Sequence, residues 1–433
     1  MDLEVHSLKV YLKRIMIIKE LNMIDKSYYE EYAKLAVING VNVQKGQLLV
    51  LSAPVEAYDL IRQCVKVAYE AGASKVIVNY DDDQISRMHY EYMPLEELCD
   101  VPDWQVSRQQ YFIDKGACFL HIVGEDPDLL NGIDQNRIKE ASLARMKKMK
   151  QFQYYTMNNV GQWSIIAYPN LAWAKKVFPD KNDEEAMDAL WEAILFTSRI
   201  EKGKTVDNWN KHNKEIHDHC VILNDYNFKS LHFKNSKGTD LKVGLIKDHK
   251  WEGGYDYASG NGAAFNPNIP TEEVFTMPDR YHIDGKVVST KPLSYAGNII
   301  SEFELTFKDG RVVEYHAKDN EEVLKNLLET DEGTKSLGEV ALISYDSPIS
   351  NSNILFFDTL FDENASCHLA LGACYPTNVK DGTKMSREEL YELGGNDSME
   401  HVDFMFGSAD LSVIGERYDE SLVTVFKDGN FII

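Results

Sequence analysis

The sequence predicts an α/β amino-terminal domain, with a mostly parallel sheet and flanking helices, followed by a strand-rich α+β carboxyl-terminal domain. In the first half of the chain, apolar runs alternate with segments of helical periodicity, the pattern that arises when helices connect parallel strands. After about residue 205 the chain becomes rich in short strands and Asp-Gly pairs, which favour tight turns between neighbouring strands.

The first elements form a β-α-β unit. Residues 46–52 are a buried-strand run, residues 55–71 repeat apolar positions at helical spacing, and residues 75–80 are a second strand. Further strands are predicted at residues 117–123 and 163–169, each after a helical stretch. Because right-handed crossovers return each strand to the same sheet, we expect a parallel sheet with helices on its faces.

A helix predicted from about residue 183 to residue 200 leads out of this sheet. We place the first domain at residues 1–205 and the second at residues 206–433. No Pro/Ser-rich linker marks the boundary, so it is defined by the change of pattern alone.

Asp-Gly pairs predict tight turns in the second domain, because both residue types tolerate positive φ. They occur at Asp284-Gly285, Asp309-Gly310 and Asp428-Gly429. The strands predicted at residues 303–307 and 312–315 flank the second pair, so this segment is expected to be a hairpin.

The composition is that of a globular protein with a large core: 433 residues, of which 44% are hydrophobic and 27% are charged. The net charge of −23 argues against a nucleic-acid partner, because phosphate backbones require concentrated Lys and Arg. An acidic field also gives a mild advantage to substrates that carry a cationic amino terminus.

The cysteines predict a reducing compartment. They are dispersed along the chain and form no Cys-x-x-Cys pair, as in a cytoplasmic protein with reduced thiols. The apolar run at residues 15–18 is too short for a signal peptide. No segment approaches the length that spans a bilayer, so we expect a cytoplasmic protein without a membrane partner.

Two imidazoles and two carboxylates lie near the carboxyl terminus in largely apolar surroundings. His401 and Asp403 lie two apart in an apparent strand, so both side chains leave the same face. Glu363 and His368 are five apart, a spacing that suggests a loop bringing both inward. Such donors suit a divalent metal, although the spacing alone also fits a hydrogen-bonded strand pair.

Other catalytic patterns are weaker. The chain has no Gly-x-Ser-x-Gly elbow and no phosphate-binding glycine pattern between a strand and a helix. Cys367 and His368 are sequence neighbours that face apart, so they form no nucleophile dyad. We expect the pair His217 and His219 to diverge on a helix, and the acidic run 81–83 to be solvated loop.

Longer motifs, in a fixed order, carry a family resemblance. They comprise residues 268–276, 290–295, 337–342, 346–350, 353–356, 361–368, 395–398 and 401–405. On these motifs the chain resembles the dinuclear metalloaminopeptidases of the aminopeptidase T and aminopeptidase S type, over about residues 28–433.

The resemblance implies a metal-ligand set of carboxylates and imidazoles: Glu273, Glu339, Glu363, His368, His401 and Asp403. In this family the carboxylate of the Leu-Gly-Glu motif contacts both ions, so Glu339 is the expected bridge. Tyr375 matches a tyrosine over the site, and its phenol would donate to the oxyanion of a tetrahedral intermediate. The implied cofactors are two divalent metal ions, for which zinc, cobalt, manganese and magnesium all remain candidates.

The implied function is a metal-dependent aminopeptidase that removes the first residue of short peptides with a water activated by two metals. Family members form homodimers, so a homodimer is expected here. Glu272, beside Glu273, is a conceivable proton shuttle, but neighbours on an extended segment point opposite ways. The sequence does not identify the general base.

Two alternatives remain open: a metal-dependent phosphoesterase, which also uses paired ions, and a non-catalytic peptide-binding protein on the same fold. Residues 1–25 depart from the family, which usually lacks or shortens them. Their apolar residues, at Leu8, Leu12 and 15–18, have the pattern of an amphipathic helix.

Overall fold

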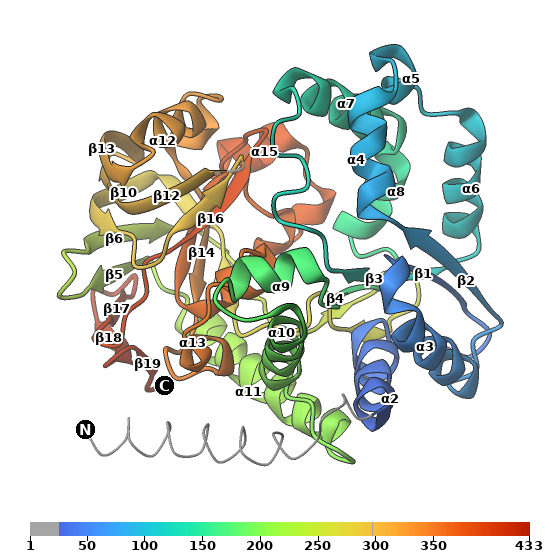
Figure 1. Ribbon diagram of the computed structural model, residues 1–433. Helices are drawn as coiled ribbons and strands as arrows, with labels where there is room; N and C mark the ends of the chain where they lie inside the picture. The colour runs from blue at the N-terminus through green and yellow to red at the C-terminus, as the bar shows by residue number, and fades with distance from the viewer. Residues whose placement is uncertain (1–25, 297) are drawn as a thin grey trace.

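A computed structural model describes residues 26–296 and 298–433 of the protein (Figure 1). The extension at residues 1–25, for which an amphipathic helix is predicted, lies outside the described residues. Figure 1 shows a helix-covered sheet on the right and a strand-rich region on the left. The predicted succession of a parallel sheet with helices and then a strand-rich region is therefore confirmed, whereas the division after residue 205 stays a prediction.

The first sheet has four parallel strands in the order β2-β1-β3-β4. Each predicted strand is present, within two residues at either end. The strands are β1 (Leu48–Pro54), β2 (Lys75–Asp81), β3 (Cys118–Val123) and β4 (Trp163–Ala167). The apolar runs of β1, β3 and β4 are mostly buried because both faces of the sheet are covered there, whereas the edge strand β2 is partly exposed.

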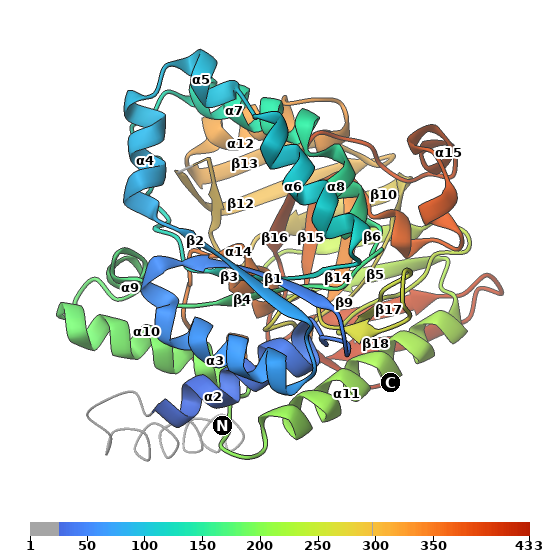
Figure 2. The same cartoon turned by 90° about the vertical axis from the view of Figure 1, so that its right-hand side faces the viewer.

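Helices cover both faces: Figure 2 shows α2 and α3 below the sheet and α6 and α8 above it. The helices of the first half are α2 (Lys26–Lys34), η1 (Leu35–Gly40), η2 (Val55–Ala57), α3 (Tyr58–Glu70), α4 (Asp83–Tyr92), α5 (Leu95–Cys99), α6 (Asp103–Asp114), α7 (Gln135–Lys148), α8 (Lys150–Met157), α9 (Leu171–Val177), α10 (Asp183–Thr197) and α11 (Thr205–Tyr226). Among the described helices, none combines the length and apolar character that a bilayer crossing requires.

The strand-rich region contains a large and a small sheet. The large sheet runs β11-β12-β10-β6-β5-β17-β18-β19, with β13 paired to β12, and the four-stranded sheet runs β16-β15-β14-β9, antiparallel throughout. The strands are β5 (Ser230–Lys234), β6 (Asp240–Leu245), β9 (Val274–Thr276), β10 (Pro278–Val288), β11 (Leu293–Tyr295), β12 (Asn298–Lys308), β13 (Arg311–Asp319), β14 (Leu337–Leu342), β15 (His368–Gly372), β16 (His401–Met405), β17 (Ser412–Glu416), β18 (Leu422–Lys427) and β19 (Asn430–Phe431).

Short elements complete this region. They are the pair β7 (Asp256–Tyr257) and β8 (Ala264–Phe265), the helices α12 (Glu321–Leu328), α13 (Pro348–Ser352), α14 (Thr359–Asp362) and α15 (Arg387–Glu392), and the 3₁₀ turns η3 (Gly333–Lys335), η4 (Glu363–Ala365), η5 (Pro376–Asn378) and η6 (Gly382–Lys384).

Two of the predicted Asp-Gly turns are confirmed and one is wrong. Asp309 and Gly310 have φ of 47° and 81° and join β12 to β13, and the pair at 428–429 likewise joins β18 to β19. Gly285 instead lies inside β10, with φ of 117°. A Cβ there would lie 2.2 Å from the carbonyl oxygen of Asp240, so this glycine permits close strand approach within the sheet.

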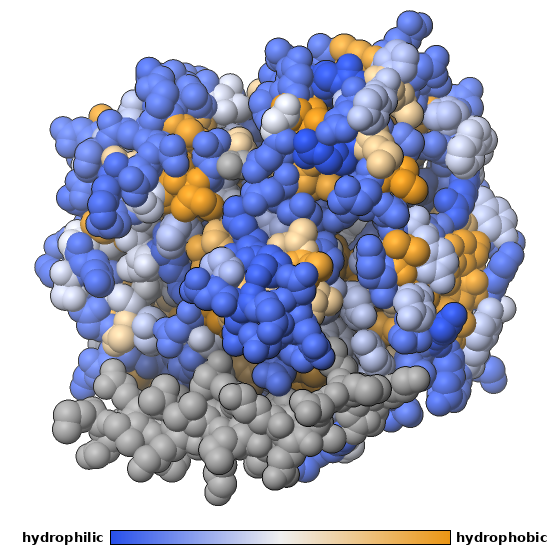
Figure 3. Space-filling view, viewed as in Figure 1, coloured by the Kyte–Doolittle hydropathy of each residue, from blue (hydrophilic) through white to orange (hydrophobic). Residues whose placement is uncertain are grey.

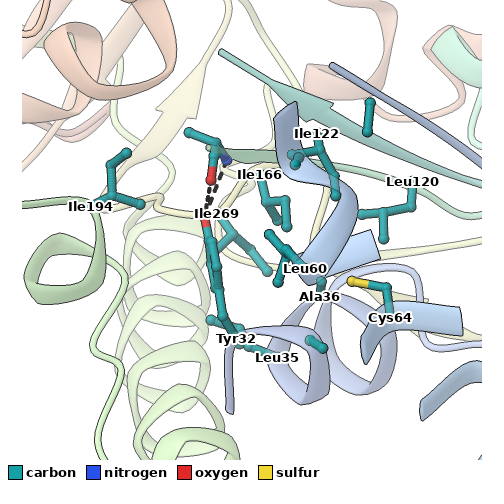
Figure 4. Packing of buried hydrophobic residues seen from close by; sticks show 14 of the residues in the cluster. Tyr32, Leu35, Ala36, Leu60, Cys64, Leu120, Ile122, Ile166, Ile194 and Ile269 are labelled. Atoms are coloured by element: carbon teal, nitrogen blue, oxygen red, sulfur yellow. Dashed lines mark hydrogen bonds between the residues drawn. The ribbon is translucent and has the colours of Figure 1, made fainter. Parts of the chain in front are cut away.

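The core under the first sheet is shared with segments from the second half of the chain. Tyr32, Leu60 and Ile166 pack together with Ile269, as Figure 4 shows. Phe361 belongs to the same buried cluster. The two regions are therefore joined by common apolar packing.

The segment before β9 also runs beside the first sheet. Ile165 on β4 donates its N–H to the carbonyl of Pro267 at 2.7 Å and accepts a bond from the N–H of Ile269 at 3.0 Å.

On the face seen in Figure 3, hydrophobic residues form separate patches among hydrophilic ones, which suits the acidic composition.

Replacing Tyr32 with Phe is expected to lower the free energy of unfolding by about 1–3 kcal/mol. The buried hydroxyl donates to the carbonyl of Ala167 at 3.0 Å and accepts from its N–H at 3.1 Å, and the variant leaves both groups unpaired. Urea unfolding measures the change. Tyr92→Phe, at a side chain that is 79% exposed, is the control, and equal stability of the two variants would contradict the role of this contact.

Candidate metal centre

The four-stranded sheet presents predicted ligands on one face. Glu339 on β14 lies opposite Ala370 on β15, and Ala370 lies opposite Asp403 on β16. Because opposite residues of antiparallel strands share a face, both carboxylates project on the same side. His368, two residues before Ala370, shares that side. The small Ala370 side chain fills little of the space between the two carboxylates.

The other predicted ligands lie around the same face. His401 lies two residues before Asp403 on β16 and points the same way, so the strand predicted for this pair is confirmed. Glu273 directly precedes β9, and Glu363 begins η4. A Cβ on Gly253 would lie 2.2 Å from the carbonyl oxygen of Glu273, so a glycine is needed where this backbone passes.

The imidazoles lie between carboxylates. Nε2 of His368 is 3.3 Å from Oε2 of Glu273, 3.2 Å from Oε1 of Glu339 and 3.9 Å from Oδ1 of Asp403. Nε2 of His401 is 3.7 Å from Oε2 of Glu339 and 3.4 Å from Oδ1 of Asp403. In the described part of the chain, these three carboxylates have ion pairs with the two histidines alone.

Two compact groups of donors follow from these distances. One consists of Glu273, Glu339 and His368, the other of Glu339, His401 and Asp403. Within each group the donor atoms lie within 4.8 Å of one another, close enough to share a cation. Glu339 belongs to both groups and offers one oxygen to each, which fits the bridging position expected for it.

The donor chemistry fits a divalent cation. Nδ1 of His401 is 2.8 Å from the carbonyl oxygen of Ala373, so it donates there and leaves Nε2 free as a ligand atom. Oδ1 of Asp403 is buried and has no hydrogen-bond partner among the described residues. A buried carboxylate oxygen without a donor is costly unless a cation occupies the neighbouring space.

The pKa values of the two histidines reflect the negative charge of the carboxylates around them. Burial opposes protonation of His401, but the negative charges of Asp403 and Glu339 raise the pKa of His401 to about 9. Burial likewise opposes charge on His368, yet hydrogen bonds to Glu273 and Glu339 raise its pKa well above the usual value. The site therefore attracts positive charge, and a bound cation would displace these protons.

Glu363 belongs to neither compact group. It lines the same cavity and accepts a hydrogen bond from Nδ2 of Asn364 at 3.3 Å. Burial, followed by the charges of Asp403 and Glu273, raises the pKa of Glu363 well above its usual value. Its carboxyl group thus shares the electrostatic field of the cluster.

A cavity of about 310 Å³ opens onto these side chains. The ring of Tyr375 lies over it, with its centroid 4.7 Å from that of His401 and 6.0 Å from that of Phe275. Although 36% of the Tyr375 surface is exposed, burial of its phenol, followed by the nearby carboxylates, raises the pKa of Tyr375 well above its usual value, so the phenol stays protonated and can donate. The cavity wall further includes Met157, Asn159, Trp163, Glu252, Gly253, Gly254, Tyr255, Asp256, Pro267, Asn268, Thr271 and Thr377.

Comparison with known proteins agrees with this donor set. The family described as thermophilic metalloproteases (M29) matches residues 25–431 of the chain. The chain belongs to the M29 metalloprotease family. The solved structure of wild-type AmpT from Thermus thermophilus matches with a TM-score of 0.87 and 38% identity, covering 94% of this chain and 100% of that chain.

Curated relatives of this M29 protein match over nearly their whole length. Aminopeptidase AmpS of Bacillus subtilis (strain 168) is 45% identical over 400 residues, which is 92% of this chain and 97% of AmpS. Aminopeptidase 2 of Geobacillus stearothermophilus is 44% identical over 402 residues, 93% of this chain and 97% of the relative. The family resemblance read from the sequence motifs is thereby confirmed.

Other residues singled out in the sequence lie away from this cluster of candidate metal ligands. Glu272 points away from the ligands and pairs with Arg199, so it is not placed to move a proton in the cavity. The Cys367 thiol exchanges hydrogen bonds with the backbone of Ile343, and burial raises the pKa of Cys367 to about 12. It is a packed, unreactive thiol, as the absence of a dyad predicts.

The weaker acidic and imidazole patterns also have ordinary roles. His217 and His219 diverge on α11, stacking against Tyr255 and Phe431, as expected of a helix. The interpretation of residues 81–83 as solvated loop is wrong: Asp82 caps α4 by accepting the N–H of Ile85 at 3.0 Å, and position 83 begins that helix. A helix start so soon after a strand leaves no room for a loop.

Two polar residues beside the cluster of expected ligands were not predicted from the sequence. Asn364 is fully buried and bonds both the segment before β9 and Glu363. Asn364 lies inside the motif at residues 361–368, and this position was the one sequence feature that could have indicated a role at the site. Arg199 follows α10 and pairs with Glu272, and nothing in its local sequence separates it from a surface charge.

Gly338→Ala is expected to weaken divalent-cation binding at least tenfold, an order of magnitude typical of displaced ligand support. The added Cβ would lie 2.1 Å from the carbonyl oxygen of Ala373 and would push β14, with Glu339, away from β15. Isothermal calorimetry with cobalt(II) measures the affinity.

Gly415→Ala, whose Cβ would meet the ring of Phe228 at 2.3 Å in the large sheet, is a control for overcrowding alone. The control is expected to lower stability and to keep the cation affinity. Unchanged affinity in both variants would show that the approach of β14 to β15 does not set the centre.

Proposed function

We propose that this protein is a metal-dependent aminopeptidase that hydrolyses the first peptide bond of short peptides. The observation that carries the proposal is the pair of donor groups joined by Glu339 in a chain whose relatives are named aminopeptidases. Two cations are part of the proposal, because each group offers three donors and one carboxylate serves both.

The proposed ligands of one cation are Glu273, Glu339 and His368, and those of the other are Glu339, His401 and Asp403, which form the two compact groups. Glu363 is proposed as a further ligand on the same cavity wall. When bound, paired divalent ions polarise a carbonyl and lower the pKa of a water molecule. Zinc, cobalt, manganese and magnesium all suit such a mixed set.

The chain's own groups account for binding and orientation of the substrate. Glu252 and Asp256 line the cavity. Glu252 pairs with Lys250, so Asp256 is the carboxyl group proposed to favour a protonated amino terminus. Burial, followed by the charge of Glu252, raises the pKa of Asp256 to about 6. Tyr375 retains its proton and is proposed to donate to the oxygen that becomes negative during attack on the carbonyl.

Homodimer formation and a cytoplasmic location are parts of the same proposal. The dimer follows from the family resemblance. The location is supported by the cysteines, all of which are free thiols. Sedimentation equilibrium of the purified protein would test the dimer.

The purified protein is expected to release leucine from leucine p-nitroanilide and from dipeptides, and to lose this activity on chelation. Activity should return when cobalt(II), zinc or manganese is added back. Glu339→Gln should bind fewer cations per chain, because the shared carboxylate serves both groups. Elemental analysis gives the stoichiometry, and Glu304→Gln, at a surface carboxylate paired with Lys286, is the control.

Release of phosphate from a nitrophenyl ester, measured in parallel, addresses the phosphoesterase alternative. Tight peptide binding without turnover in the cation-loaded protein would favour the non-catalytic alternative. The proposal would be wrong if the wild-type protein bound no divalent cation.

Tyr375→Phe is expected to lower kcat by about 10²–10³-fold, the loss typical of an oxyanion donor. The KM for dipeptides and the calorimetric affinity for cobalt(II) should stay near those of the wild type, because the ring still packs on His401. If kcat is unchanged, the phenol has no role in the transition state.

A further inference from the structure

The segment that carries Glu273 is held between the two regions of the molecule. Its start, at residues 267–269, bonds to β4 of the parallel sheet, and its end becomes β9 of the four-stranded sheet. Three residues, Thr271 to Glu273, lie between the buried Pro270 and Val274. How these residues are fixed decides where the Glu273 carboxylate lies.

Arg199 anchors this segment through Glu272. Nη1 and Nη2 of Arg199 donate to Oε1 and Oε2 of Glu272 at 2.5 and 2.7 Å, a bidentate pair that fixes orientation as well as distance. The side chains are 19% and 6% exposed. Arg199 lies in the turn between α10 and α11 with φ of 55°, a left-handed conformation that ordinary residues adopt at a cost.

Helix α11 supports the same anchor. Nε2 of His212 donates to the carbonyl of Thr271 at 2.7 Å and lies 3.7 Å from Oε2 of Glu272. Nε1 of Trp209 donates to the carbonyl of Ser198 at 2.7 Å, one residue before Arg199. Both ends of the ion pair are thus attached to one helix, which also packs against η1, α2 and β9.

Asn364 connects the anchor to a second proposed ligand. Its Oδ1 accepts the backbone N–H of Glu272 at 2.8 Å, and its Nδ2 donates to Oε1 of Glu363 at 3.3 Å. Nδ2 also donates to the carbonyl of Leu360 at 3.2 Å. The side chain is fully buried, so these contacts hold it in one orientation.

The ligand and its neighbour point to opposite partners. Glu272 contacts Arg199, whereas Glu273 contacts His368. Fixing the side chain and the N–H of Glu272 therefore fixes the direction in which the next side chain leaves the backbone.

We propose that Arg199, Glu272 and Asn364 form a positioning network that sets the Glu273 and Glu363 carboxylates for cation binding. The network couples the α10–α11 turn of the helical region to the metal centre in the strand-rich region. This inference rests on the ligand roles given under the proposed function, and none of the three residues lines the cavity.

The test measures cobalt(II) affinity of the full-length apo protein by calorimetry, beside its thermal unfolding midpoint. Arg199→Gln, Glu272→Gln and Asn364→Ala are each expected to weaken cobalt binding by about 10–100-fold, the range for residues that orient metal ligands. Arg87→Gln is the matched control. Arg87 also bonds a carboxylate, Glu91, and two carbonyl oxygens, but it contacts no proposed ligand, and its variant should bind cobalt within about twofold of the wild type.

The double variant Arg199→Gln/Glu272→Gln separates positioning from simple burial of an unpaired charge. Each single variant leaves one buried charge without its partner, whereas the double variant removes both charges. If the loss of affinity comes only from that unpaired charge, the cobalt affinity of the double variant should return toward the wild-type value. A positioning role predicts that the double variant stays about as weak as the weaker single variant, without additive loss. Arg199→Lys, which keeps the charge but not the fork, should recover part of the affinity.

Wild-type cobalt affinity in folded Arg199→Gln and Asn364→Ala would overturn the network, as would full recovery in the double variant. If Arg199→Gln does not fold, Asn364→Ala and Arg199→Lys decide the question by the same affinities. A wild type that binds cobalt but cleaves no peptide would end the proposed function and leave this inference standing. If the wild type cleaves peptides but the variants keep its cobalt affinity, the proposed function stands and the positioning network is wrong.

Discussion

The mutual repulsion of carboxylates held together out of water is the constraint on which the centre depends. Glu273, Glu339 and Asp403 lie within ion-pair distance of His368, and the half-buried Glu363 lines the same cavity. In the described residues, no lysine or arginine forms an ion pair with these groups. Protonated imidazoles compensate part of the charge, and divalent cations compensate it more fully.

Backbone geometry makes this concentration of charge sterically feasible. Glycines stand where strands approach too closely for a Cβ: Gly338 beside Ala373, and Gly372 beside Glu400. The small Ala370 separates Glu339 from Asp403 across three strands. The sheet thus places donors from distant parts of the chain at neighbouring positions on one face, which a single loop could not do with the same rigidity.

The two regions contribute differently to the centre. The four-stranded sheet carries most of the donors, whereas the helical region supplies packing and the arginine that pairs with Glu272. Trp163, which begins β4, lines the cavity together with the donors. The cavity is therefore built by both regions. Their shared core includes Ile269 and Phe361 and fixes the positions of the cavity walls relative to each other.

The strands of the parallel sheet could be predicted from the amino-acid sequence alone, because long apolar runs have few other places in a folded chain. The same holds for His401 and Asp403, which leave one face of a strand because the period of two is local geometry. The expected ligands were inferred from the resemblance of the motifs to a known family. Their grouping into two sets that share Glu339 could be seen only in the folded structure.

Features that depend on pairing between distant segments could not be predicted before the fold was known. Gly285 occupies a strand because a neighbouring backbone approaches it, although Asp-Gly locally favours a turn. Arg199 and Glu272 are 73 positions apart, and nothing in either local sequence distinguishes this ion pair from solvated surface charges. Local propensity is encoded within a few residues, whereas burial and charge pairing are set by whichever segments the completed fold brings together.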